Sequence, residues 1–281
     1  MSFRRLFTLS VLLIFQYSIS QDVVYLDHNL NQITEIEYEN LRHHRICYRF
    51  THKTDSVTYK KIGLRHKFGK LPPKKLEQLK LYISSRSKTK LNEDELILIA
   101  HIDSLHDYSS YVRNFIRTHP DNFNPSLKVK RIYSEKRKSE FPNARLYMLE
   151  KDEFIKSENK RFKRNVKCKN QIQKQYPVQV FYSYSEKFRS EPFPDELNWI
   201  PDNGIFKSQF FPFEHYGKVI IIKPNGEYFV SSSLNSKLEK VLIKKQNWKE
   251  AEAQLIEIVK NNPLYRNYGI FTYNRDYKCF K

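Results

Sequence analysis

The chain has 281 residues, of which 40% are hydrophobic and 15% aromatic, so it can bury a core as one large domain or two small ones. Because it has only 6 Gly beside 20 Phe and 19 Tyr, the composition excludes a flexible linker protein. Lys and Arg total 50 against 31 Asp and Glu, and the resulting formal charge of +19 attracts nucleic acid, anionic lipid or acidic polymers.

The first twenty residues have the layout of a secretory signal peptide. Two arginines precede an apolar run over residues 6–15, and serines stand at positions −3 and −1 from a cleavage site before Gln21. The run is shorter than the ~20 apolar residues that span a bilayer, and no later stretch qualifies. We therefore expect a secreted or periplasmic protein whose signal peptide comprises residues 1–20. Retention of this segment as an uncleaved anchor is the alternative.

The N-terminal part of the mature chain, residues 21–92, is predicted to be an α+β extension. Thr34 and Glu37 have the spacing of a capping box for a short helix over 35–42. The other predicted elements are strands over 23–26, 45–52 and 56–66 and a helix over 74–87 with Leu76, Leu79 and Ile83 inward.

Residues 95–101 are predicted to form a central strand, because the five consecutive apolar residues at 96–100 are typical of a strand covered on both faces. Asp107 is expected to cap the following helix. The inner stripe of that helix would be Tyr111, Val112, Phe115 and Ile116, and His119–Pro120 would end it. After a polar, basic stretch over 121–141, the predicted elements are a strand over 144–150, a charged helix over 151–165 and a strand over 177–184.

The clearest local signal is a hairpin near the end of the chain. Val219–Ile222 and Glu227–Ser231 are predicted to pair as antiparallel strands around a tight turn at Pro224, Asn225 and Gly226. A helix follows over 248–262, with Ala251, Leu255, Ile258 and Val259 inward. The aromatic tail over 263–281 is expected to pack back on the body.

The order of elements from residue 93 to 262 resembles the thioredoxin-like fold. The stretch "KVIIIKPNGEYFV" is similar to the hairpin that ends many exported thioredoxin-like proteins, and "WIPDNGIFKSQFF" stands where that family often has an Asp and a short helix. The resemblance implies an α/β domain with a thioredoxin-like mixed sheet, containing parallel strands and a closing antiparallel hairpin, flanked by helices.

In the resembled family, a CxxC motif follows the first central strand and a cis-proline precedes the hairpin. The matching segment here, "IDSLHDY", contains no cysteine, and Tyr216, Gly217 and Lys218 occupy the place of the proline. The resemblance therefore implies an exported protein without redox activity and without a cofactor. We expect a binding or structural module of the cell envelope.

Five residues around this segment are candidate ligand-binding residues: His101, Asp103, Ser104, His106 and Asp107. Imidazole and carboxylate groups are suitable zinc or iron ligands, so a metal-binding protein or an envelope enzyme is the alternative function. His101 and Asp103 share a strand face only if the strand continues that far. A Ser104–His106 nucleophile pair is disfavoured because residues i and i+2 of a helix do not face each other. We favour structural roles and assign neither a metal nor a catalytic residue.

The three cysteines are Cys47, Cys168 and Cys279. An exported chain permits disulfides, and an odd number allows at most one intramolecular pair and leaves a thiol over. Neither a CxxC motif nor a zinc-binding spacing is present, which favours structural or free thiols over catalytic ones. The sequence permits Cys168 to pair with Cys47 or with Cys279, and the candidate pair that we name is Cys168–Cys279.

Basic and aromatic residues alternate in "KKQNWKE", "NKRFKRNVKCK" and "YRNYGIFTYNRDYK". Such segments can bind nucleic acid through stacking and phosphate contacts. An export signal argues against intracellular nucleic acid as the partner. We expect the partner to be an envelope protein instead. Alternatively, the protein is a basic adaptor that binds an anionic polymer or lipid headgroups.

Overall fold

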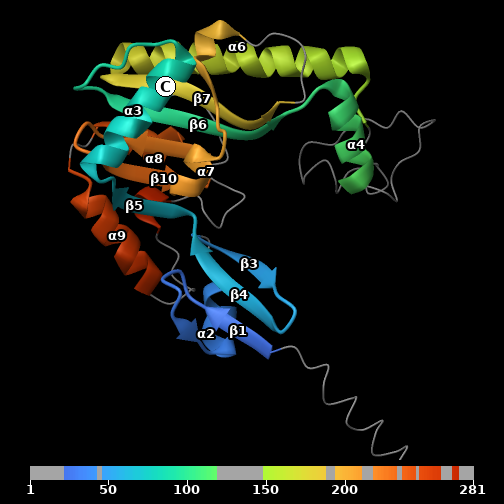
Figure 1. Ribbon diagram of the computed structural model, residues 1–281, viewed down its shortest axis with the longest axis vertical. Coiled ribbons are helices and arrows are strands. Elements are labelled where there is room, and N and C mark those ends of the chain that lie inside the picture. Colours follow the sequence, from blue (N-terminus) through green and yellow to red (C-terminus); the bar gives the residue numbers. More distant parts are fainter. Residues whose placement is uncertain are drawn as a thin grey trace, which may run out of the picture. The chain divides into compact units, whose positions relative to one another are not determined.

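A computed structural model describes residues 22–42, 46–118, 148–187, 194–210, 218–232, 236–244, 247–260 and 268–271 (Figure 1). The architecture is mixed α/β, with two mixed sheets and flanking helices. The chain divides into two compact units, Met1–Lys67 with Trp248–Thr272 and Phe68–Asn247 with Tyr273–Lys281. The predicted signal peptide and most of the aromatic tail lie outside the described residues. Among the helices described, none is both long enough and apolar enough to cross a bilayer.

The first unit contains a four-stranded sheet in the order β2-β1-β4-β3, where β1 and β4 are parallel and the other pairs are antiparallel. The strands are β1 (Asp22–Leu26), β2 (Gln32–Ile33), β3 (Cys47–Lys53) and β4 (Val57–Leu64). Helix α2 (Glu35–Arg42) begins with the predicted capping box, which is confirmed. Glu37 Oε2 accepts a hydrogen bond from Thr34 N at 2.8 Å, and Glu37 N donates to Thr34 Oγ1 at 3.2 Å.

Helix α9 (Lys249–Lys260) and the short 3-10 helix η3 (Gly269–Phe271) also belong to this unit. Ala251, Leu255 and Ile258 of α9 are buried as predicted, and Val259 is partly buried. His66, at the end of the first unit, is buried with its ring 5.2 Å from that of Phe271.

A six-stranded sheet in the order β5-β10-β9-β6-β7-β8 forms the second unit, except that the first two residues of its edge strand β5 belong to the first unit. The strands are β5 (His66–Lys70), β6 (Leu96–Leu105), β7 (Val178–Lys187), β8 (Trp199–Pro201), β9 (Val219–Ile222) and β10 (Glu227–Ser231). Strands β6, β7 and β8 are parallel, whereas β9 is antiparallel to both β6 and β10. The predicted central strand is confirmed: Ile99 is fully buried, with Phe181 of β7 on one side and Ile220 of β9 on the other.

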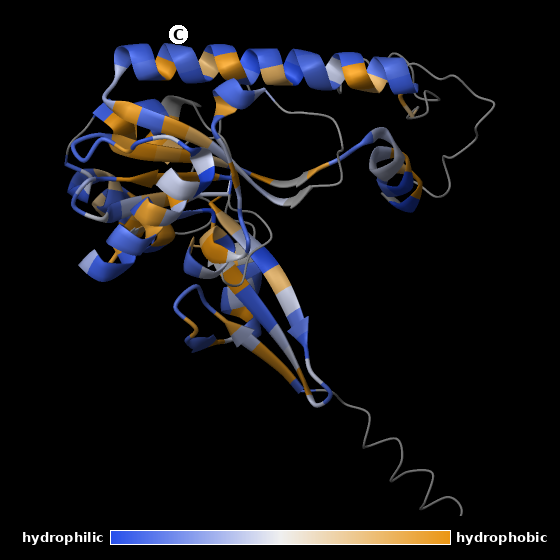
Figure 2. Ribbon diagram, turned by 45° about the horizontal axis from the view of Figure 1, so that its top comes forward, coloured by the Kyte–Doolittle hydropathy of each residue, from blue (hydrophilic) through white to orange (hydrophobic). Residues whose placement is uncertain are grey.

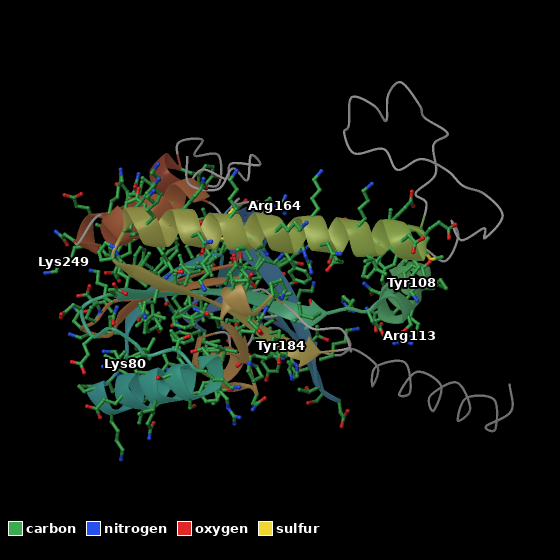
Figure 3. All side chains as sticks on the ribbon, turned by 90° about the horizontal axis from the view of Figure 1, so that it is seen from above. Lys80, Tyr108, Arg113, Arg164, Tyr184 and Lys249 are labelled. Atoms are coloured by element: carbon green, nitrogen blue, oxygen red, sulfur yellow. The ribbon has the colours of Figure 1, made fainter. Side chains whose placement is uncertain are left out.

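Helices cover both faces of this sheet (Figure 3). On one face lie α3 (Pro73–Ser87) and α7 (Ile205–Phe210), and the rings of Tyr82 and Phe206 from these helices lie 6.0 Å apart. The predicted inner residues of α3 are buried in this core, which comprises Leu71, Leu76, Leu79, Ile83, Ile97, Ile99, Phe181, Ile200, Phe206, Phe210, Ile220, Ile222, Tyr228 and Val230. On the other face lies α6 (Lys151–Gln175), where Phe162 meets the Trp199 ring edge-on at 6.0 Å. Helix α8 (Ser236–Lys244) follows β10.

The prediction of a strand over 144–150 is wrong for residues 148–150, which belong to no strand; residues 144–147 lie outside the described part of the chain. The backbone N–H and C=O groups of Leu149 form hydrogen bonds with two tyrosine side chains instead of with a neighbouring strand. Leu149 N donates to Tyr111 Oη at 3.0 Å, and Tyr108 Oη donates to Leu149 O at 3.1 Å. Glu150 forms a capping box with Glu153 and so begins α6. The tyrosines come from α4 (Tyr108–Thr118), in which the predicted inward residue Ile116 is instead exposed.

Strands β6 and β7 and helix α6 extend several residues beyond their predicted ends, and β7 ends at Lys187 rather than at 184. Strand β6 ends at Leu105 rather than at 101, because its pairing with β7 continues to Leu105↔Lys187. Helix α6 ends at Gln175 rather than at 165, because Cys168 and Ile172 extend its buried face by two turns.

The predicted hairpin of β9 and β10 is confirmed, and its turn depends on Gly226. Gly226 N donates to Lys223 O at 2.9 Å, and Gly226 has a φ of +84°. This is a three-residue loop that ends in a left-handed glycine. A Cβ on Gly226 would lie 3.0 Å from Leu71 O, and the Leu71 N–H donates to Gly226 O at 2.9 Å.

We expect Gly226→Ala to lower the free energy of unfolding by about 2 kcal/mol. Alanine is strained in the left-handed backbone conformation, and its Cβ would crowd the Leu71 carbonyl oxygen. Urea unfolding followed by circular dichroism measures the change. Gly204→Ala is the matched control, because Gly204 has the same φ of +84° but no heavy atom within 4 Å of an added Cβ. Equal losses in the two variants would contradict the role of the Leu71 contact.

Candidate functional site

The middle of β6 and β7 holds a buried polar cluster centred on His101. His101 is 7% exposed, and its Nδ1 lies 2.8 Å from Ser183 Oγ. Its Nε2 lies 3.2 Å from Ser185 Oγ. Ser183 faces His101 across the parallel pair and is fully buried, whereas Ser185 is exposed. Both imidazole nitrogens therefore have hydroxyl partners supplied by the neighbouring strand.

Asp202 completes the cluster from the loop between β8 and α7. Asp202 Oδ1 accepts a hydrogen bond from Phe206 N at 2.6 Å, and Oδ2 accepts one from Lys207 N at 3.2 Å. The carboxylate thus satisfies two backbone donors at the start of α7. Asp202 is 1% exposed, and this burial raises the pKa of its carboxyl group, an effect opposed by the Phe206 hydrogen bond and by the nearby His101.

Aromatic residues border the cluster. Tyr82 of α3 donates its hydroxyl hydrogen to Pro201 O at 2.5 Å, and burial raises the pKa of Tyr82. Arg86 lies over the Tyr82 ring at 5.7 Å, and the Tyr184 ring meets that of Trp199 at 6.1 Å. These contacts tie α3 and β7 to the β8 end of the sheet.

The five candidate residues lie on β6 and on the two residues that link it to α4. His101 lies in β6, as predicted, and β6 also includes Asp103 and Ser104, which were expected in the turn that follows the strand. The side chains of Asp103 and Ser104 are outside the described part of the structure. The condition for His101 and Asp103 to share a strand face is met, because β6 continues to Leu105. His106 follows the strand and is partly buried.

Asp107 has the predicted capping role. Its Oδ1 accepts a hydrogen bond from Ser110 N at 2.7 Å, and hydrogen bonds from the Ser110 side chain and backbone lower the pKa of the Asp107 carboxyl group. Within the described ranges, no three His, Cys, Asp or Glu side chains converge on a point where they could hold a metal ion.

Cys168 of α6 is disulfide-bonded, Cys47 at the start of β3 is a free, buried thiol, and Cys279 lies outside the described residues. Burial raises the pKa of Cys47 to about 12. The thiolate is the reactive form, so Cys47 is a poor nucleophile in the folded protein.

We expect Cys47 to react with Ellman's reagent about a thousandfold more slowly in the native protein than in denaturant, because its folded pKa lies about three units above that of a free thiol. The unfolded, unreduced chain should release one equivalent of thiol. A full equivalent released rapidly from native protein would contradict the burial of this side chain.

Sequence reasoning missed Ser183, Ser185 and Asp202, which come from β7 and the β8–α7 loop. One signal was available. When the apolar run 96–100 is aligned as a parallel neighbour of residues 178–182, which are apolar except for Gln179, His101 falls opposite Ser183.

One arrangement in the cluster is suited to proton transfer. In the tautomer protonated at Nδ1, His101 donates to Ser183 Oγ, and its free Nε2 accepts from the exposed Ser185 hydroxyl. An imidazole held in this way can withdraw a proton from a serine that solvent reaches.

Comparison of the chain with models of protein families, with curated proteins and with solved structures finds no match.

Proposed function

We propose that this protein is an exported thioredoxin-like binding module of the cell envelope that lacks thiol–disulfide activity. The element arrangement of the second unit supports the likeness. Parallel strands β6 and β7 are joined through α6, and the antiparallel hairpin β9–β10 leads into α8. Asp202 and α7 precede the hairpin, as the resemblance implies for "WIPDNGIFKSQFF".

The segment that follows the apolar run of β6 carries the proposal. The segment "IDSLHDY" (102–108), which matches the place of the resembled family's reactive cysteine pair, contains no cysteine, and the preceding His101 is buried between two serine hydroxyls. A hydroxyl cannot form a disulfide, and the free thiol Cys47 is buried with its pKa raised to about 12. Binding through the shape and charge of the surface is the function that this arrangement supports best.

Insulin reduction tests the proposal. With dithiothreitol as reductant, we expect insulin to precipitate no faster with the protein than without it, while a thioredoxin shortens the lag. Cys168→Ser serves as the second arm, because Cys168 is the described cysteine that is disulfide-bonded. Catalysis by the wild type that disappears in Cys168→Ser would locate exchange chemistry on α6 and refute the proposal.

The Ser185–His101 contact favours a second candidate function, ester hydrolysis. Ser185 Oγ would attack an acyl carbonyl and give its proton to His101 Nε2. The imidazolium would return that proton to the departing alcohol, and water would then release the acid from the acyl-serine. Labelling by a fluorophosphonate probe in the wild type, lost in Ser185→Ala and retained in Ser104→Ala, would establish this activity. Absence of labelling in the wild type would rule out ester hydrolysis at Ser185.

A further inference from the structure

Helix α6 carries a stripe of lysines that is separate from the His101 cluster. Five exposed lysines form it and are together called the lysine stripe: Lys156, Lys160, Lys163, Lys167 and Lys174. Their spacings of four, three, four and seven residues place them within an arc of about 60° and along a length of ~27 Å. Figure 3 shows α6 as a straight helix over the sheet, with the neighbouring Arg164 labelled.

The lysine stripe lies opposite the face by which α6 packs on the sheet. The buried residues of the helix are Phe154, Phe162, Asn165, Cys168, Lys169 and Ile172. At 100° per residue, these positions centre about 180° from the stripe. The lysines therefore project directly away from the six-stranded sheet, along a convex ridge.

The charge along the stripe is uniform from Lys160 onward, whereas exposed Asp152 and Glu153 lie within one turn of Lys156. Residues 159–175 contain seven Lys or Arg and no Asp or Glu. Among these residues, the exposed side chains other than the stripe lysines are those of Arg164 and of the amides Asn159, Asn170, Gln173 and Gln175. The preceding acid, Glu158, forms an ion pair with Arg161 at 2.5 Å. Figure 2 shows the same helix as predominantly hydrophilic.

We propose that the lysine stripe docks on a bilayer surface rich in anionic phospholipid headgroups. A straight convex ridge meets a plane along a line, which is the shape of the stripe. Lysines are point charges that suit a disordered array of headgroup phosphates. The stripe has no apolar side chain to insert into the acyl region, so the contact is peripheral and electrostatic.

Nucleic acid fits the same surface less well. Recognition of single strands combines a basic groove with aromatic side chains on which bases stack. The exposed face of α6 after residue 158 presents no aromatic side chain, and it is a ridge rather than a groove. The proposal goes beyond the function proposed above and does not depend on the thioredoxin likeness, so the insulin result leaves it standing.

Vesicle sedimentation of the full chain tests the proposal. The probes are vesicles of equal parts phosphatidylglycerol and phosphatidylcholine, and vesicles of phosphatidylcholine alone. The test variant is Lys160→Gln/Lys163→Gln/Lys167→Gln. The matched control, Lys74→Gln/Lys75→Gln/Lys90→Gln, removes the same charge from exposed lysines in and after α3. Equal thermal melts establish that both variants fold.

We expect the stripe variant to bind the anionic vesicles about a hundredfold more weakly and the control within threefold of wild type. Phosphatidylcholine vesicles should bind none of the three proteins. Equal losses in both variants would show that binding follows total charge and would overturn the proposal, as would binding to the neutral vesicles. Tighter binding to a single-stranded oligonucleotide at the same salt concentration, lost in the stripe variant, would assign the surface to nucleic acid instead.

Discussion

Replacing Asp202 with alanine is expected to lower the free energy of unfolding by about 3 kcal/mol. The substitution removes the acceptor of the Phe206 and Lys207 N–H groups at a position that is 1% exposed, so water cannot replace it without opening the site. His101 would lose its nearby negative charge at the same time. Urea unfolding monitored by tryptophan fluorescence gives the value, since Trp199 lies in β8.

Two further variants make this prediction specific. Asp202→Asn keeps one acceptor oxygen and should lose about half as much stability. Asp94→Ala replaces an exposed aspartate before β6 and should change stability by no more than about 0.5 kcal/mol. An Asp202→Ala variant as stable as Asp94→Ala would mean that Asp202 does not cap α7.

Acid is expected to destabilise the protein through His66. Burial lowers the pKa of His66 to about 3, and Arg65 acts in the same direction. Above about pH 6.5 this histidine is neutral in both states and adds no pH dependence. Between about pH 6.5 and 3 the unfolded chain takes up a proton that the folded protein refuses, so stability falls as the pH falls, by up to about 1.4 kcal/mol per pH unit.

Unfolding curves measured between about pH 7.5 and about pH 5, a range that brackets the ordinary histidine pKa, should show this slope. The His66→Phe substitution should flatten it. Phenylalanine keeps an aromatic ring against Phe271 but does not titrate. His52→Asn is the matched control, because His52 is exposed on β3. A His66→Phe variant with the wild-type slope would show that another group causes the acid sensitivity.

The parts of the fold that follow from local physical rules were predictable from the sequence. The Thr34–Glu37 capping box, the inward stripe of α3 and the Pro-Asn-Gly turn before β10 each depend on residues within a few positions of one another. The buried run of β6 was also identified, because five consecutive apolar residues need cover on both sides.

The parts that depend on distant partners were not predictable. The extension of β6 to Leu105 requires β7, whose residues lie about 80 positions later in the chain. The pairing of β5 with β10 crosses an even larger separation, and the sequence grouped residues 66–70 with the N-terminal extension instead. The error at residues 148–150 arose because the tyrosine hydroxyls of α4 bind the Leu149 backbone in place of a neighbouring strand.

The candidate site shows the same division. Asp107 was identified correctly as a cap because its partner Ser110 is three residues away. His101 was identified as a candidate, but its two hydroxyl partners on the neighbouring strand were not. Its bonding partners, Ser183 and Ser185, become adjacent only through the register of the parallel strands.

Interstrand NOEs of β6, measured on deuterated protein with amide protons restored, test most directly whether this strand forms the centre of the sheet and places His101 beside Ser183. We predict amide contacts from Ile97–His101 to residues 178–184 on one side and to residues 218–222 on the other, with long-lived amide protons in Leu98 and Ile99. Strong sequential amide–amide NOEs over 96–100, as a helix gives, with no contact to β7 or β9, would contradict both the fold and the polar cluster built on it.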